Sequence, residues 1–245
     1  MSNVNASLVI LALLCGGAVA GKLLRAALPG HHVDDASKGT VLLGTGLVVT
    51  MSALVLGLLV GSANSSFDAQ REDVAQMSAR VVLLDRALAY YGPEAKEARD
   101  VLRTLATRAA ETIASQQTAP PPIRAEGLFN RIMQLSPKDD AQRASRQEAL
   151  QLLTQIDQTR WLAYEQRRTP FPRPLLVVVV GWLTLVFVSF GLFAPANGTV
   201  AASLFLTALS VSGAVLLILE LYSPYTGLIR VSAEPVRAAV EQLGK

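Results

Sequence analysis

The chain has 245 residues, of which 51% are hydrophobic and only 17% are charged, and its mean hydropathy is +0.37. This balance is too apolar for an ordinary soluble protein, and the clustering of the apolar residues predicts membrane spans. The net charge of +3 is small and dispersed, which argues against a nucleic-acid partner, and a single cysteine excludes an internal disulfide.

The first predicted span covers residues 7–24. A cleaved signal peptide competes with this interpretation, but the residues before the span contain no lysine or arginine, so a retained helix is favoured. Gly17 and Gly21 have the small-xxx-small spacing of closely packed transmembrane helices. We therefore expect close helix contact along that face.

The loop after the first span contains a cluster of titratable residues: His31, His32, Asp34 and Asp35. One interpretation is a helix start, with an aspartate as N-cap and the histidines at the level of the headgroups. Another is an ion mouth or pH sensor, because histidine titrates near neutral pH and responds to an adjacent carboxylate. A metal site is least favoured, since consecutive residues rarely face one ion and no third ligand group is evident.

The second predicted span covers residues 40–64 and carries no charged side chain. It is rich in small and hydroxyl residues, which let helix backbones approach each other in lipid. Five of them, Gly46, Thr50, Ala53, Gly57 and Gly61, fall on one helical stripe together with Asn64. Such a stripe either packs against another helix or lines a narrow polar path.

Residues 64–173 are predicted to form an antiparallel helical domain inserted between spans two and three. Its first helix continues from the second span, with apolar residues that alternate by three and four, as in a coiled coil that holds subunits together. These positions are Phe67, Val74, Met77, Val81, Leu84, Leu88 and Tyr91. Pro93 suits the start of the next helix, and Ser136 is the expected N-cap of the last one.

The remaining spans cover residues 175–193 and 199–221, so the predicted fold class is an all-α membrane protein with four transmembrane helices. The domain boundaries follow: 1–63, 64–173, 174–222 and 223–245. Arginines near the span ends outnumber the cations of the first loop, Lys22, Arg25 and Lys38. This asymmetry predicts that both termini and the helical domain are cytoplasmic.

Glu220 lies at the end of the fourth span, where an ionisable residue is either a permeation group or part of an ion pair. We expect an ion pair with a basic residue at the return to the membrane, Arg168 or Arg173. No strand signal, phosphate-binding loop or nucleophile elbow is present in the inserted domain, and we expect no enzyme activity, catalytic residue, cofactor or metal.

Several motifs together resemble a bacterial membrane family of unknown function, the bestrophin-like family. Gly30-His31-His32-x-Asp34 precedes a glycine-rich span, a helical insertion follows, and Glu220-x-x-x-Pro224-Tyr225-x-Gly227 comes after the last span. The resemblance covers nearly the whole chain. It implies a distant likeness to bestrophins, which are oligomeric channels with cytosolic termini and a pore lined by the second span.

Carried to this sequence, the resemblance implies a pentamer with the small-residue stripe near the axis, and a structural elbow at Glu220, Pro224, Tyr225 and Gly227. Two departures limit it. The residues after the elbow, 228–232, contain no acid, so calcium gating is not implied. The second span has no aromatic residue that could form the constriction expected in a bestrophin pore.

Two functions from different classes are therefore in view. The first is a homo-oligomeric ion channel or pore-like protein, whose partners are the lipid bilayer, its own copies and an inorganic ion of unassigned identity. The alternative is a non-conducting membrane scaffold or sensor whose helical domain binds a cytoplasmic partner. Conductance from purified protein discriminates between them.

Overall fold

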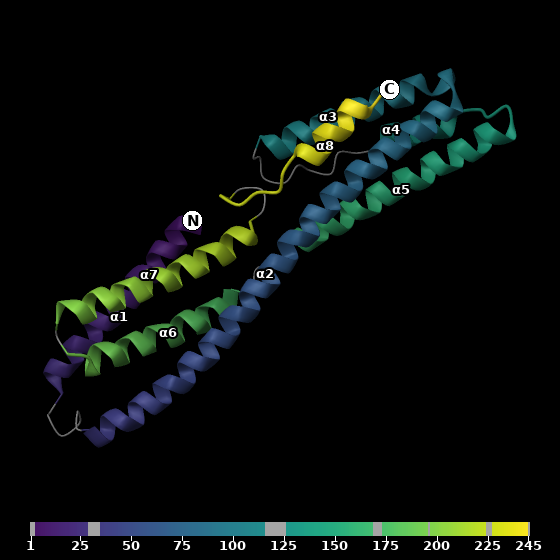
Figure 1. Ribbon diagram of the computed structural model, residues 1–245. Coiled ribbons are helices and arrows are strands. Elements are labelled where there is room, and N and C mark those ends of the chain that lie inside the picture. Colours follow the sequence, from purple (N-terminus) through teal and green to yellow (C-terminus); the bar gives the residue numbers. More distant parts are fainter. Residues whose placement is uncertain are drawn as a thin grey trace. The chain divides into compact units, whose positions relative to one another are not determined.

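The computed structural model describes residues 3–28, 35–115, 126–168, 173–195, 197–223 and 227–244, and within these ranges all side chains except those of 35–37, 164, 166–168 and 173. Every regular element in this part of the chain is a helix (Figure 1). The helices are α1 (Asn3–Ala27), α2 (Asp35–Tyr91), η2 (Pro93–Ala95), α3 (Lys96–Ala114), α4 (Glu126–Gln134), α5 (Asp140–Arg168), α6 (Arg173–Phe193), α7 (Gly198–Leu221) and α8 (Glu234–Gln242). The predicted all-α class is confirmed.

The chain divides into two compact units. The first, here called the membrane unit, comprises Met1–Ser66 and Phe171–Tyr222, and the second unit comprises Phe67–Pro170 and Ser223–Lys245. Helix α2 is continuous through both, as the sequence predicts. Four helices, α1, α2, α6 and α7, are long and apolar enough to cross a bilayer, which confirms the four predicted apolar spans.

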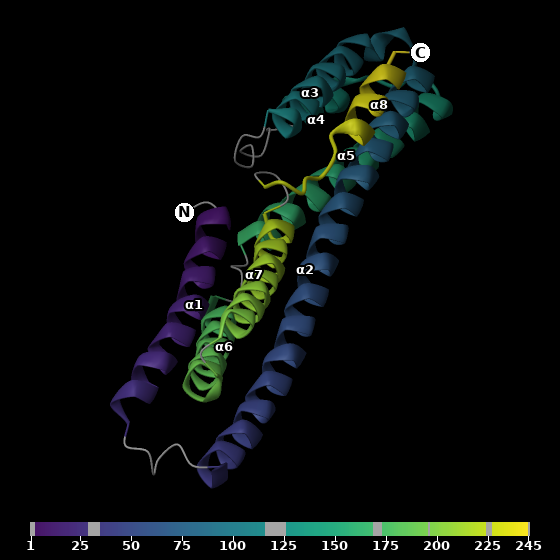
Figure 2. The ribbon, with the colours of Figure 1, turned by 60° about the vertical axis from the view of Figure 1, so that its left-hand side comes forward.

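Glycines bring α1 and α6 into close contact in the membrane unit (Figure 2). A Cβ atom on Gly17 would lie 3.0 Å from the carbonyl oxygen of Thr184, and one on Gly21 would lie 2.1 Å from that of Val188. From the other side, a Cβ on Gly191 would lie 2.0 Å from the carbonyl oxygen of Ala18. The expected close contact at Gly17 and Gly21 is confirmed, because no larger residue leaves room for the two backbones.

Helix α7 is joined to α1 by buried hydroxyl groups. The Oγ atoms of Ser7 and Ser212 are 2.7 Å apart, and each hydroxyl also reaches the other residue's carbonyl oxygen, at 3.0 Å and 2.7 Å. Such bonds count in lipid, where no water replaces a lost partner. Around them the core of the membrane unit is apolar and includes Leu14, Val179 and Phe187.

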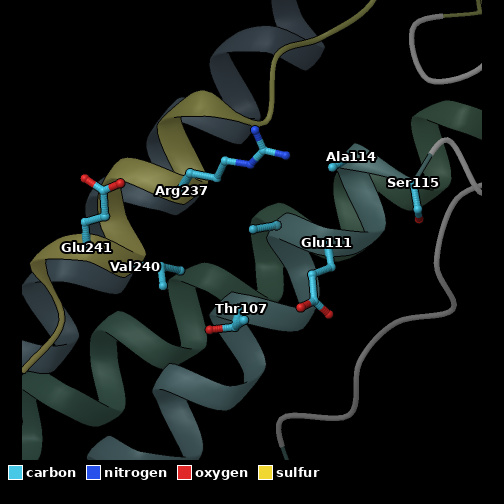
Figure 3. Close-up of a pocket in the computed structure, with 8 residues that line it drawn as sticks. Thr107, Glu111, Ala114, Ser115, Arg237, Val240 and Glu241 are labelled. Atoms are coloured by element: carbon cyan, nitrogen blue, oxygen red, sulfur yellow. The ribbon is translucent and has the colours of Figure 1, made fainter.

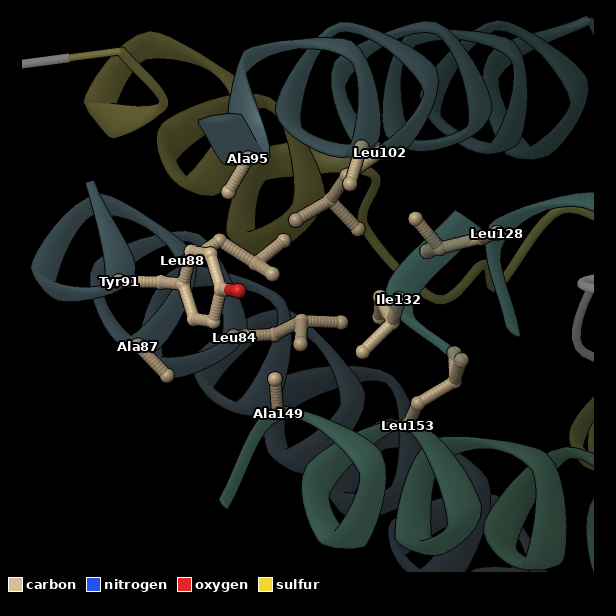
Figure 4. Close-up of a cluster of buried hydrophobic side chains, with 11 residues drawn as sticks. Leu84, Ala87, Leu88, Tyr91, Ala95, Leu102, Leu128, Ile132, Ala149 and Leu153 are labelled. Atoms are coloured by element: carbon tan, nitrogen blue, oxygen red, sulfur yellow. The ribbon is translucent and has the colours of Figure 1, made fainter. Parts of the chain in front are cut away.

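The core of the second unit is built from α2, α3, α4 and α5 (Figure 4). Leu84, Leu88 and Tyr91 of α2 are buried with Leu102 of α3 and Ile132 of α4. The C-terminal positions of the predicted coiled-coil pattern thus pack on helices of the same chain and not on another subunit. Contact between subunits along the earlier positions stays a prediction.

Turn chemistry determines where the helices of the second unit begin. Gly92 ends α2 with a φ of +118°, a backbone conformation that side-chain-bearing residues rarely adopt. Helix α5 begins at Asp140, later than predicted. Asp139, rather than Ser136, caps it, since the Oδ1 atom of Asp139 accepts the N–H of Gln142 at 2.7 Å.

Asp85 of α2 binds the C-terminal segment within the second unit. Its buried carboxylate accepts hydrogen bonds from Nε and Nη2 of Arg99, at 2.8 Å and 2.7 Å, and from the backbone N–H of Gly244, at 3.1 Å. Burial opposes ionisation of the carboxyl group, but these donors and the nearby charges of Arg99 and Arg103 outweigh it and lower the pKa of Asp85.

Candidate functional site

The small-residue stripe of α2 lies on the surface of the single chain. Gly46, Thr50, Ala53, Gly57, Gly61 and Asn64 are all exposed. A Cβ atom built on Gly46, Gly57 or Gly61 would meet no neighbouring atom within 4 Å. Among the described residues of the membrane unit, no helix therefore closes on these glycines.

Helix α2 uses a different face to join the membrane unit. Its buried residues there are Thr45, Ser52, Leu59 and Ala63. At about 100° per residue, this face lies roughly 130° around the helix from the small-residue stripe. A third face carries exposed large apolar side chains, Leu47, Leu54 and Leu58, which suit contact with acyl chains.

The polar groups of this helix are partly satisfied within it. The hydroxyl of Thr50 donates to the carbonyl oxygen of Gly46 at 3.0 Å, and that of Ser52 donates to Val48 at 2.7 Å. This back-bonding lets a hydroxyl face an apolar medium or a narrow water path without a second partner. The stripe is therefore uncharged and weakly polar, and its side chains are short.

Two glycine pairs of identical spacing have opposite environments in this chain. Gly17 and Gly21 are closed against α6, whereas Gly57 and Gly61 are open. In the most apolar 18-residue stretch of α2, only 6% of the residues are buried, against 22–28% in the corresponding stretches of the other three spans. The second span is thus the least covered of the four within one chain.

A family model described as Bestrophin-like domain matches residues 12–236. The chain belongs to the bestrophin-like family. No curated protein and no solved structure matches it. Membership supports a membrane protein with a channel kind of function, in agreement with the four apolar spans.

The histidine and aspartate cluster of this bestrophin-like protein cannot be placed. His31, His32 and Asp34 lie outside the described residues, and Asp35 begins α2 with a side chain that is not described. The three interpretations of the cluster stay predictions. Among the described residues, no three His, Cys, Asp or Glu side chains lie together in a way that could hold a metal ion.

Glu220 is buried at the end of α7, with 4% of its surface exposed. Its Oε1 atom accepts a hydrogen bond from Nδ2 of Asn3 at 3.1 Å, and the same amide donates to the carbonyl oxygen of Leu219 at 3.3 Å. The expected partners Arg168 and Arg173 have side chains outside the described set, so the ion pair stays a prediction. Sequence reasoning missed Asn3 as a partner of Glu220. The predicted topology could have indicated it, because the start of the first span and the end of the fourth lie on the same side of the membrane.

The elbow after α7 is described only in part. Pro224 and Tyr225 lie outside the described residues. The backbone N–H of Gly227 donates to the carbonyl oxygen of Ser223 at 3.2 Å, and the Gly227 carbonyl oxygen accepts from Nε of Arg230 at 2.6 Å. Of the predicted elbow residues, Gly227 is thus hydrogen-bonded through both its N–H and its carbonyl group.

Proposed function

We propose that this protein is a homo-oligomeric ion channel in which copies of α2 turn their small-residue stripe toward a common axis. The family supports a channel kind of function. The observation that carries the stripe's assignment is that all six residues are exposed in the single chain, with open space beside Gly46, Gly57 and Gly61. A symmetric ring of copies covers one such face on every subunit at once.

The chemistry of the stripe suits a path for ions better than contact with lipid. Glycines leave room beside the helix, and Thr50 and Asn64 add a hydroxyl and an amide. The diameter of a pore and the hydrogen-bonding groups that line it determine what passes through it. Against acyl chains the same residues contribute less packing than the leucines of the third face.

The proposal includes an assembly and an orientation. By likeness to bestrophins, we expect five copies. The charge asymmetry at the span ends supports cytoplasmic termini and a cytoplasmic second unit in a bacterial inner membrane. In this orientation His31, His32, Asp34 and Asp35 face the outside as an ion mouth or pH sensor, and Glu220 to Gly227 form the elbow beneath the membrane.

Accessibility of adjacent positions tests the assignment. In a Cys15→Ser background, Ala53→Cys places a thiol on the stripe and Leu54→Cys places one on the leucine face. Liposomes containing the purified protein should pass ions, and a charged, water-soluble thiol reagent should block flux through the Ala53→Cys variant only. Absence of flux, or equal modification of both variants, would refute the proposal.

The alternative function is a non-conducting scaffold or sensor whose second unit binds a partner. It is supported by a groove of about 520 Å³ between α3 and α8 (Figure 3). Its floor includes Ala110 and Val240, and the exposed charges of Glu111, Arg237 and Glu241 line its edges. This function predicts a stoichiometric soluble partner that Val240→Asp releases, together with no ion flux.

A further inference from the structure

A cavity of about 170 Å³ lies within the membrane unit, between α1, α6 and α7. Its floor includes the buried Phe187 and Gly191 of α6, and its exposed rim includes Val19, Lys22 and Phe205. None of the residues that line it comes from α2. The cavity is therefore independent of the small-residue stripe and of the proposed ion path.

The packing of α1 explains where the cavity occurs. The pair Ser7 and Ser212 holds α1 against α7 near the start of α1 and the end of α7. Farther along, Gly21 and Gly191 draw α1 onto α6. The cavity lies in this second region, where its α7 wall begins with the small side chains of Val200 and Ala201.

Among the described residues that line the cavity, Lys22 alone is charged. A charged side chain within a span is costly in lipid unless it finds a partner or reaches the interface. The Lys22 ammonium has no acidic or hydrogen-bonding partner among the residues that the structure describes. Its neighbour Arg25, three residues on, already donates to the carbonyl oxygen of Ala194 at 3.0 Å, at the end of α6.

Cys15 and Lys22 mark two positions along the cavity on helix α1. They are seven residues apart, which places them on the same face of α1 and about 10 Å apart along its axis. Lys22 is near the end of the helix and Cys15 is near its middle. The mostly apolar cavity thus extends from a cation near the end of α1 toward the middle of that helix.

We propose that this cavity binds an anionic phospholipid, with the lipid phosphate on Lys22 and part of one acyl chain along Cys15 and Phe187. The apolar lining fits a hydrocarbon chain, and the ammonium group fits a phosphate. The volume is below the roughly 300–1,000 Å³ of pockets that enclose a small molecule. The rest of the lipid therefore lies in the bilayer, over the exposed rim.

Cys15 is the only cysteine of the chain, so a thiol reagent reports on the cavity and no cysteine has to be introduced. The wild-type chain, Lys22→Gln and the matched control Lys38→Gln are placed in nanodiscs of phosphatidylcholine, with or without phosphatidylglycerol. The rate of labelling by N-ethylmaleimide is then followed by intact-protein mass spectrometry. Lys38 is an exposed cation near the start of α2, and it is not among the residues that line the cavity.

Phosphatidylglycerol should slow labelling of the wild type and of Lys38→Gln by about fivefold, which corresponds to about 1 kcal/mol for one lysine at an anionic surface. Lys22→Gln should lose this effect. The surface potential of the nanodisc acts equally on all three proteins, so only a difference between them reports the site. Equal slowing in Lys22→Gln, or no slowing in the wild type, overturns the proposal.

Native mass spectrometry of the wild-type protein provides a second measurement that needs no variant. Protein extracted from a mixed membrane should retain phosphatidylglycerol in preference to phosphatidylcholine. Equal retention of the two lipids contradicts the proposal.

Discussion

Replacement of Gly21 by alanine tests the central packing contact of the membrane unit. The added Cβ would lie 2.1 Å from the carbonyl oxygen of Val188, 2.9 Å from the backbone nitrogen of Leu192 and 3.0 Å from Cα of Gly191. Ordinary contacts of a Cβ atom begin at 3.4 Å. All three neighbours are backbone atoms of α6, so no side-chain rotation relieves the overlap and the two helices must separate.

The magnitude follows from two opposing effects. Overpacking of a well-packed core costs about 1–3 kcal/mol, and separation of α1 from α6 also loosens the buried contacts of Leu14 and Phe187. Alanine recovers up to about 1 kcal/mol through its higher helix propensity. We therefore expect Gly21→Ala to destabilise the membrane unit by about 2 kcal/mol.

The half-buried thiol of Cys15, on the same helix, provides the assay. A fluorogenic maleimide labels Cys15 as the detergent-solubilised protein unfolds on heating, and the midpoint should fall by roughly 5 °C. Gly181→Ala is the matched control, because a Cβ there meets nothing within 4 Å on the same helix α6. If Gly21→Ala and Gly181→Ala melt together with the wild type, the close approach of α1 to α6 is refuted.

Three further predictions concern other contacts. Ser7→Ala and Ser212→Ala should show a coupling of about 0.6–1.7 kcal/mol in a double-mutant cycle of thermal stability, the range for hydrogen bonds between transmembrane helices. Asp85→Asn should cost about 2–3 kcal/mol near neutral pH in denaturant unfolding followed by tryptophan fluorescence, because the neutral amide has one acceptor oxygen for the two donors of Arg99 and loses the charge that strengthens both bonds. Because the pKa of Asp85 is lowered in the fold, its contribution is complete above the unfolded value of about 3.9 and disappears as pH falls through the folded value. Gly92→Ala should cost about 1–3 kcal/mol in thermal unfolding followed by circular dichroism, because its φ of +118° and ψ of −172° suit glycine alone.

Each of these has an outcome that contradicts it. Additive effects of the two serine substitutions would mean that the hydroxyls do not interact. If the stability difference between the wild type and Asp85→Asn is the same at pH 3 and at pH 7, the ionised carboxylate does not provide the stabilising contact. A Gly92→Ala protein as stable as the wild type would show that the turn after α2 adopts another conformation.

Local patterns were sufficient for much of the fold. The apolar runs predicted four spans, and the spacing of Gly17 and Gly21 predicted a tight contact that α6 provides. Both signals depend only on the helix period and on side-chain size, and both can be recognised from residues that are close together in the sequence. The same reasoning placed the six residues of α2 on one stripe.

The errors arose where a partner had to be chosen. The coiled-coil pattern of α2 could not reveal that α3, α4 and α5 of the same chain cover Leu84, Leu88 and Tyr91. The cap of α5 moved to Asp139 because several polar residues in that loop could serve, and only the backbone path selects one. Asn3 as a partner of Glu220 links residues 217 positions apart, a distance that no local pattern spans.

The amino-acid sequence by itself determined how many helices are apolar enough to cross a membrane, where small glycine residues occur in them, and which spans carry no charge. Only the tertiary structure decided that Gly17 and Gly21 are closed against α6 while Gly57 and Gly61 are open, since both pairs have the same local spacing. It also decided that Lys22 lines a cavity with Cys15. Periodicity is a property of one helix, whereas closure of a face depends on which other helix reaches it.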